Sequence, residues 1–66
     1  MKIKINGKQE TVGGPLNLLE LVLARGLVPD NIVVEHNLNI TSKADWQKIA
    51  LKEDDSIEIV SFVGGG

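Results

Sequence analysis

Cysteine and tyrosine are absent from this 66-residue chain, and histidine, tryptophan and phenylalanine occur once each. Without cysteine the chain forms no disulfide, no thiolate metal site and no cysteine nucleophile. With His36 as the only histidine, we expect neither a protein-only zinc site nor a catalytic triad. A domain this short buries only about 60% of the surface of its unfolded chain. Its stability therefore has to come from packing.

Clustered positive charge and long apolar runs are missing as well. Seven Lys and Arg against nine Asp and Glu leave a formal net charge of −2, and the charges are scattered. Nucleic-acid sites use clustered cations, often with aromatic side chains for stacking, so we expect no nucleic-acid partner. No apolar run approaches the ~20 residues that span a bilayer, so no membrane association is expected. Residues 1–4 lack the apolar region of a signal peptide, which predicts a cytoplasmic protein.

The first segment that the sequence does specify is a hairpin. Lysine and isoleucine alternate over residues 2–6, which predicts a strand with both isoleucines on one face. Asn6-Gly7 follows directly and favours a type I′ turn, because both central residues of that turn need positive φ. Residues 8–12 are therefore expected to form the return strand, which the following Gly-Gly-Pro ends.

Residues 16–25 predict the main helix, because leucine and valine cover more than half of its circumference. Asn17 can accept hydrogen bonds from the free N–H groups of the first turn. Glu20 stands three residues later, where a capping box places its acid. Gly26 can adopt the left-handed conformation that ends a helix.

The second half of the chain predicts shorter elements. A β-branched run at residues 32–35 indicates a third strand, Ile40 a further short strand, and residues 56–62 the last strand. Residues 43–50 predict one short helix or 3₁₀ turn. The order of a hairpin, a helix, a strand, a short helix and a strand predicts an α+β fold, with a mixed sheet packed on one main helix.

Several further positions have structural interpretations. Ser42 resembles an N-cap, with Asp45 three residues later as its capping-box acid. Trp46 is expected to cover the core. The acidic segment 53–55 predicts a solvated turn, because it offers too few ligands for a cation. His36 has no partner motif and is expected to be a structural or surface residue.

The sequence continues after the last strand with Val63 and three glycines, Gly64, Gly65 and Gly66. We expect a folded domain over residues 1–62 and a flexible tail over residues 63–66. A tail without β-carbons is narrow enough to enter a channel, and it extends roughly 13 Å at about 3.3 Å per residue. A frayed end without a function is the alternative. If the tail is functional, the carboxylate of Gly66 is its reactive group.

Together these features resemble the ThiS family, the bacterial sulfur carriers of thiamine biosynthesis, which have the ubiquitin-like β-grasp fold. The resemblance covers the whole chain and is carried by Asn6-Gly7, residues 42–46, Leu51-Lys52, Asp55 and the glycine tail. The chain departs from the family at Asp54, where glycine is common, and in the turn at residues 37–39, which lacks a glycine. Asp tolerates turn geometry, so the departure at Asp54 does not affect the tail.

The resemblance implies a role for each glycine of the tail. Gly66 would be adenylated by an E1-like adenylyltransferase that uses ATP and magnesium. A persulfide donor such as a cysteine desulfurase would then convert it to a thiocarboxylate, which thiazole synthase uses. Gly64 and Gly65 would thread the tail into the partners. The chain itself would be a protein co-substrate, with no enzyme activity, cofactor or metal of its own.

The last strand predicts where such a partner docks. If its two isoleucines face the helix, Glu58, Val60 and Phe62 lie on the opposite face. Val33 joins them if the third strand is in register. Scattered exposed apolar residues are ordinary, but a cluster beside the tail predicts a docking surface for the activating enzyme.

Other functions fit the same features. A carrier that forms the small subunit of molybdopterin synthase shares the fold and the Gly-Gly ending. A ubiquitin-like modifier would be joined through Gly66 to a lysine of another protein. A plain β-grasp binding module would have an incidental tail. An enzyme is disfavoured, because the chain offers no recognisable pair of acid and base.

Overall fold

The N-terminal hairpin forms as the sequence predicts. The computed structural model describes residues 1–62, and in it β1 (Lys2–Ile5) pairs antiparallel with β2 (Lys8–Thr11). Asn6 and Gly7 have φ values of 52° and 80°, the two positive values that a type I′ turn needs. The Asn6 side chain also accepts a hydrogen bond of 2.7 Å from the Ile59 N–H, which ties the turn to the last strand.

The main helix, α1 (Leu18–Ala24), begins two residues later than predicted. Asn17 is its N-cap: the Oδ1 atom of Asn17 accepts from the Glu20 N–H, and Glu20 Oε1 accepts from the Asn17 N–H, each at 2.8 Å. Leu16 stays outside the helix, since its carbonyl accepts from the Leu51 N–H at 2.9 Å. Gly26, with φ of 73°, follows the helix in the left-handed conformation. The capping box is thus confirmed.

Loss of this cap has a measurable cost. Asn17→Ala removes the acceptor of the Glu20 N–H, and we expect the free energy of unfolding to fall by about 1 kcal/mol. In a domain of this size that lowers the melting temperature by about 4–8 °C. Gln47→Ala, at an exposed site of the 3₁₀ helix described below, is the control and should lie within about 0.5 kcal/mol of the wild type. Equal melting temperatures for both variants would contradict the assigned role of the cap.

The second half of the chain forms the elements predicted for it, with shifted ends, and a first 3₁₀ turn that was not predicted. They are a 3₁₀ turn η1 (Pro29–Asn31), β3 (Ile32–His36), β4 (Asn39–Ile40), a 3₁₀ helix η2 (Lys43–Lys48) and β5 (Ser56–Ser61). The last strand ends one residue before the predicted end. Phe62 still donates its N–H to the Asn31 carbonyl at 3.1 Å.

The predicted side-chain cap at Ser42 is wrong. Ser42 stands at the N-cap position of η2, but its side chain makes no capping hydrogen bond. The Asp45 N–H, which a capping hydroxyl would bind, donates instead to the backbone carbonyl of Ser42 at 2.8 Å. This is the i to i+3 bond of a 3₁₀ helix, and it satisfies the same donor without the side chain.

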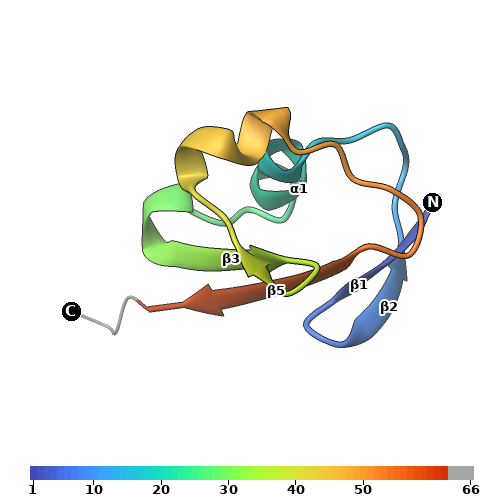
Figure 1. The fold of residues 1–66 in the computed structure, drawn as a ribbon, viewed down its shortest axis with the longest axis horizontal. Coiled ribbons are helices and arrows are strands. Elements are labelled where there is room, and N and C mark those ends of the chain that lie inside the picture. Colours follow the sequence, from blue (N-terminus) through green and yellow to red (C-terminus); the bar gives the residue numbers. More distant parts are fainter. Residues whose placement is uncertain (63–66) are drawn as a thin grey trace.

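The strands form one mixed sheet with the order β2-β1-β5-β3-β4. β1 and β5 are parallel and the other neighbours are antiparallel. α1 and η2 lie on one side of this sheet, and no helix covers its other side in residues 1–62 (Figure 1). We call the uncovered side the outer face. The arrangement is the predicted α+β architecture, one mixed sheet on one main helix and a short 3₁₀ helix.

The core lies between the sheet and these two helical elements. Its buried members come from every layer: Ile3, Ile5, Leu18, Leu21, Val22, Ile32, Val34, Trp46, Leu51 and Ile57. Trp46 is 1% exposed and closes the core from η2, as predicted. Its indole Nε1 donates to the Thr41 hydroxyl at 2.8 Å, and this hydroxyl donates to the Val34 carbonyl at 2.7 Å. The large ring is therefore buried without an unsatisfied polar atom.

Candidate functional site

The tail residues predicted to carry the chemistry, Gly64, Gly65 and Gly66, lie outside the described residues, together with Val63. The division of the chain at residues 62 and 63 and the roles of these glycines therefore stay predictions. The structure does describe the strand that leads to them, β5.

The residues of β5 alternate between the core and the outer face as predicted. Ile57 is fully buried and Ile59 is partly buried against the core. Glu58 is exposed, and Val60 and Phe62 expose 60% and 59% of their surface. The two apolar residues closest to the tail are therefore available to a partner.

Neighbouring strands extend this exposed surface. Val33 of β3 lies directly opposite Val60 and is 41% exposed, so it joins the surface. Ile40 of β4 is paired with Glu35 of β3 and is 75% exposed. Cross-strand partners share a face of the sheet, and so do residues two apart on one strand. We call Val33, Ile40, Val60 and Phe62 the apolar patch. The sequence predicted Ile40 as a strand residue but did not place it on this face, which depends on the pairing of β3 with β4.

A second group of side chains was not predicted from the sequence. Asp55 is only 8% exposed, although the acidic turn was expected to be solvated throughout. Its Oδ2 atom lies 2.8 Å from His36 Nε2 and accepts from the Lys52 N–H at 2.9 Å, while its Oδ1 atom accepts from the Asn37 amide at 3.1 Å. Glu53 and Asp54 are exposed, as predicted. The prediction is wrong at Asp55, because three donors replace the water that this carboxylate loses.

The contacts of Asp55 act in opposite directions on its pKa. Burial raises the pKa of the carboxyl, while the hydrogen bonds from His36, Asn37 and the Lys52 N–H lower it. The hydrogen bonds prevail, and the pKa lies below its ordinary value of 3.8. At neutral pH the group is therefore a carboxylate whose acceptors are used within the fold. We assign the His36–Asn37–Asp55 cluster a structural role, which agrees with the structural interpretation of His36.

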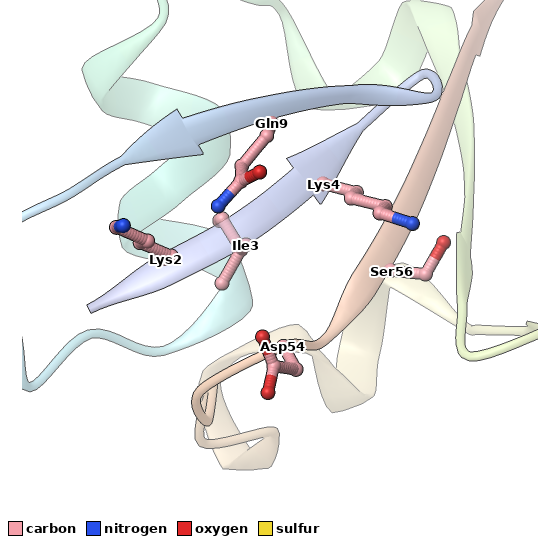
Figure 2. Close-up of a pocket in the computed structure, with 6 residues that line it drawn as sticks. All are labelled: Lys2, Ile3, Lys4, Gln9, Asp54 and Ser56. Carbon is pink, nitrogen blue, oxygen red and sulfur yellow. The ribbon is translucent and has the colours of Figure 1, made fainter.

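The outer face also has a shallow hollow near the β1–β2 hairpin. It has a volume of about 310 Å³ and is lined by Lys2, Ile3, Lys4, Gln9, Asp54 and Ser56. Figure 2 shows the Lys4 side chain extending toward Ser56, with Asp54 on the turn before β5. The lining has two ammonium groups and one carboxylate, but no arrangement of a nucleophile with a base.

Among residues 1–62, no three side chains of His, Asp or Glu gather where they could hold a metal ion. In the same residues no helix has the length and apolar character needed to cross a membrane.

Comparison with known proteins identifies the family. Residues 3–66 match the model of the ThiS family. The chain belongs to this family. It is 35% identical over 65 residues to the sulfur carrier protein ThiS of Bacillus subtilis, which covers 97% of this chain and 98% of that protein. The crystal structure of the thiamine biosynthesis protein (ThiS) from Geobacter metallireducens covers 100% of both chains with a TM-score of 0.86 and 32% identity. The predicted ubiquitin-like β-grasp fold is thereby confirmed.

A longer relative is similar to the whole chain. The thiazole synthase of Magnetococcus marinus is 36% identical over 66 residues, which cover 100% of this chain but 20% of the synthase. The chain thus spans about a fifth of the length of that relative.

Proposed function

We propose that this chain is a sulfur carrier of thiamine biosynthesis and that the carboxylate of Gly66 carries the sulfur. The proposal rests mainly on the similarity of this chain to the sulfur carrier protein of Bacillus subtilis, which extends over almost the full length of both proteins. The ThiS family match includes the glycine tail, since it extends to residue 66. In this proposal the chain is a cytoplasmic co-substrate, not an enzyme, and it binds no cofactor itself.

The chemistry follows from the low reactivity of a carboxylate. An E1-like adenylyltransferase with ATP and magnesium joins the Gly66 carboxylate to AMP and releases pyrophosphate. The terminal sulfur of a protein persulfide, for example on a cysteine desulfurase, then attacks the acyl carbon and AMP leaves. A second thiol then attacks the cysteine sulfur of the resulting acyl disulfide, forms a disulfide with that cysteine and releases the thiocarboxylate on Gly66. In this proposal Gly64 and Gly65 enter the channel of the partner, because they have no side chains to obstruct it.

Thiazole synthase is the proposed acceptor of the sulfur. The thiazole synthase of Magnetococcus marinus contains a segment similar to this entire chain, so a carrier-like unit and a synthase occur in one polypeptide. Such a fusion supports an association between the two activities. It also favours thiamine biosynthesis over molybdenum-cofactor synthesis as the pathway that this carrier serves.

The intact mass of the chain tests the chemistry. We expect a mass gain of one sulfur replacing one oxygen after incubation with the E1-like enzyme, magnesium ATP and a persulfide donor. Deletion of Gly66 should abolish the gain while the melting temperature stays unchanged. An unchanged mass of the wild type, with the enzyme active on another carrier, would reject the proposal and favour a binding module. An isopeptide bond to another protein would instead identify a modifier.

We further propose that the activating enzyme docks on Glu58, Val60 and Phe62. Val60→Asp puts a charge into the apolar patch and should weaken binding to that enzyme by about tenfold, equal to about 1.4 kcal/mol. Phe62→Ala should act in the same direction. Both side chains are exposed, so the melting temperature should change little.

Val28→Asp is the matched control for this prediction. It introduces the same charge at a residue of similar exposure, 55%, in the loop between α1 and η1. The dissociation constant should be measured by titration with the enzyme in the absence of ATP. Equal affinity of the Val60→Asp and Val28→Asp variants would place the docking surface elsewhere.

A further inference from the structure

Two glutamates face each other on the outer face without a cation between them. Glu35 of β3 lies directly opposite Glu58 of β5 in the antiparallel register. Side chains in such positions have Cβ atoms about 4.5–5.5 Å apart, and like charges there are destabilising. Within residues 1–62 neither glutamate forms an ion pair, since the pairs in that part are Arg25–Glu10, His36–Asp55 and Lys43–Asp30.

The apolar patch borders this pair of carboxylates on the same face. Val33 precedes Glu35 by two residues on β3, and Val60 follows Glu58 by two residues on β5. Ile40 is the cross-strand neighbour of Glu35 on its other side. A partner that covers the apolar patch therefore also covers the two glutamates. Removing unpaired carboxylates from water is costly, so such a partner has to supply the opposite charge.

We propose that Glu35 and Glu58 together bind one cationic side chain of the adenylating partner, set within an apolar surface that covers the patch. This inference rests on the proposed function and adds a chemical requirement on the partner. An arginine fits best, because its planar guanidinium has five N–H donors and can bond two carboxylates at once. The preference for a cation comes from charge complementarity on this face of the sheet.

Positive charge at the other end of the outer face restricts where the partner can bind. Lys2 and Lys4 of β1 alternate with the buried isoleucines of that strand, so they lie on the outer face. Lys4 lies opposite Gln9 and Ser56, at the end of the sheet where β5 begins, and Lys2 lies opposite Thr11. A basic partner surface is attracted at the glutamates and repelled at these lysines. The partner is therefore placed toward the end of β5 that leads to the tail.

Charge reversal at one glutamate, with a matched reversal elsewhere, tests the inference. Glu58→Lys and Asp45→Lys change the net charge equally, and Asp45 is exposed on η2, which packs on the opposite side of the sheet. We expect Glu58→Lys to raise the dissociation constant for the adenylyltransferase by about tenfold or more and to weaken its dependence on salt. For Asp45→Lys we expect a change of less than about twofold, since a charge outside the contact acts only at long range.

The stability of the free domain provides a second measurement. Glu58→Lys puts opposite charges across the strand pair, so its melting temperature should equal or exceed that of the wild type. If Glu58 binds the partner, Glu58→Lys should weaken binding and leave the stability of the domain unchanged or higher. A structural role for Glu58 does not predict this combination. Equal dissociation constants for Glu58→Lys and Asp45→Lys would overturn the inference even when the wild type gains sulfur. Absence of that mass gain in the wild type would reject the proposed function itself.

Discussion

Trp46→Ala is expected to remove about half of the stability of the domain and to lower the midpoint of its urea unfolding strongly. Removing a buried tryptophan side chain costs about 3–5 kcal/mol, because the surrounding residues fill the cavity only in part. At about 0.05–0.15 kcal/mol per residue, a chain of this length has a total stability of roughly 3–10 kcal/mol. Trp46 is 1% exposed, packs in the only core of residues 1–62, and donates to the Thr41 hydroxyl. One substitution therefore removes a large part of the stability.

Trp46→Phe is the matched control, because it keeps an aromatic ring in the core and removes the indole N–H. We expect it to remain folded with a loss of about 1–3 kcal/mol, from the smaller ring and the lost hydrogen bond to Thr41. Urea unfolding followed by circular dichroism measures both variants, since their tryptophan fluorescence is lost. A cooperative transition of Trp46→Ala at the wild-type midpoint would show that Trp46 does not support the core.

The hairpin and the main helix could be predicted because their signals are local. Asn6-Gly7 supplies the two positive φ values within the turn itself. Asn17 and Glu20 satisfy each other's backbone N–H groups across three residues. In both cases the residues that determine the structure are neighbours in the sequence. The predicted exposure of Val60 and Phe62 was also right, because strict alternation along a strand determines the faces once Ile57 is in the core.

The burial of Asp55 could not be predicted in the same way. Its side-chain partners are His36 and Asn37, which lie 19 and 18 residues earlier in the chain. Only the pairing of β3 with β5, which places His36 opposite Ile57, brings these residues together. The position of Glu35 directly opposite Glu58 depends on the same register. The sequence therefore predicted the alternation along β5, and Val33 beside it on condition of the register, but not the contacts of Asp55 and Glu35 across the sheet.

Asp55→Asn is expected to lower the free energy of unfolding at pH 7 by about 1.5–3 kcal/mol, the range for hydrogen bonds to a charged group. The new amide has nearly the same size, but its NH₂ group faces donors that previously bound a carboxylate oxygen. Those donors are His36 Nε2, the Lys52 N–H and the Asn37 amide. Asp54→Asn is the control: it removes an equal charge from an exposed neighbour, and Asn tolerates the φ of 69° there. It should lie within about 0.5 kcal/mol of the wild type.

The pH dependence of stability distinguishes the contribution of the negative charge of Asp55 from the contribution of the shape of its side chain. Because the folded domain lowers the pKa of this carboxyl, its contribution is complete above the ordinary value of 3.8 and is lost as the pH falls through the lower folded value. The difference in unfolding free energy between the wild type and Asp55→Asn should therefore be constant from pH 7 to about pH 5 and shrink below about pH 4. Urea midpoints measured between pH 7 and pH 3 test this, and parallel curves would contradict it.

The comparison of Asp55→Asn with the wild type also bears on the proposed docking surface, because the His36–Asn37–Asp55 cluster joins the end of β3 to the turn before β5. Asn37 and Ser56 reinforce this join: the Asn37 N–H donates to the Ser56 carbonyl at 2.8 Å, and the Ser56 N–H donates to Asn37 Oδ1 at 2.9 Å. These are the two strands that bring Glu35 opposite Glu58 and Val33 opposite Val60. If the cluster maintains this register, Asp55→Asn should weaken binding to the adenylating partner as well as stability, although Asp55 itself is buried. Unchanged binding by the folded variant would show that the pairing of β3 with β5 holds the docking surface without the cluster.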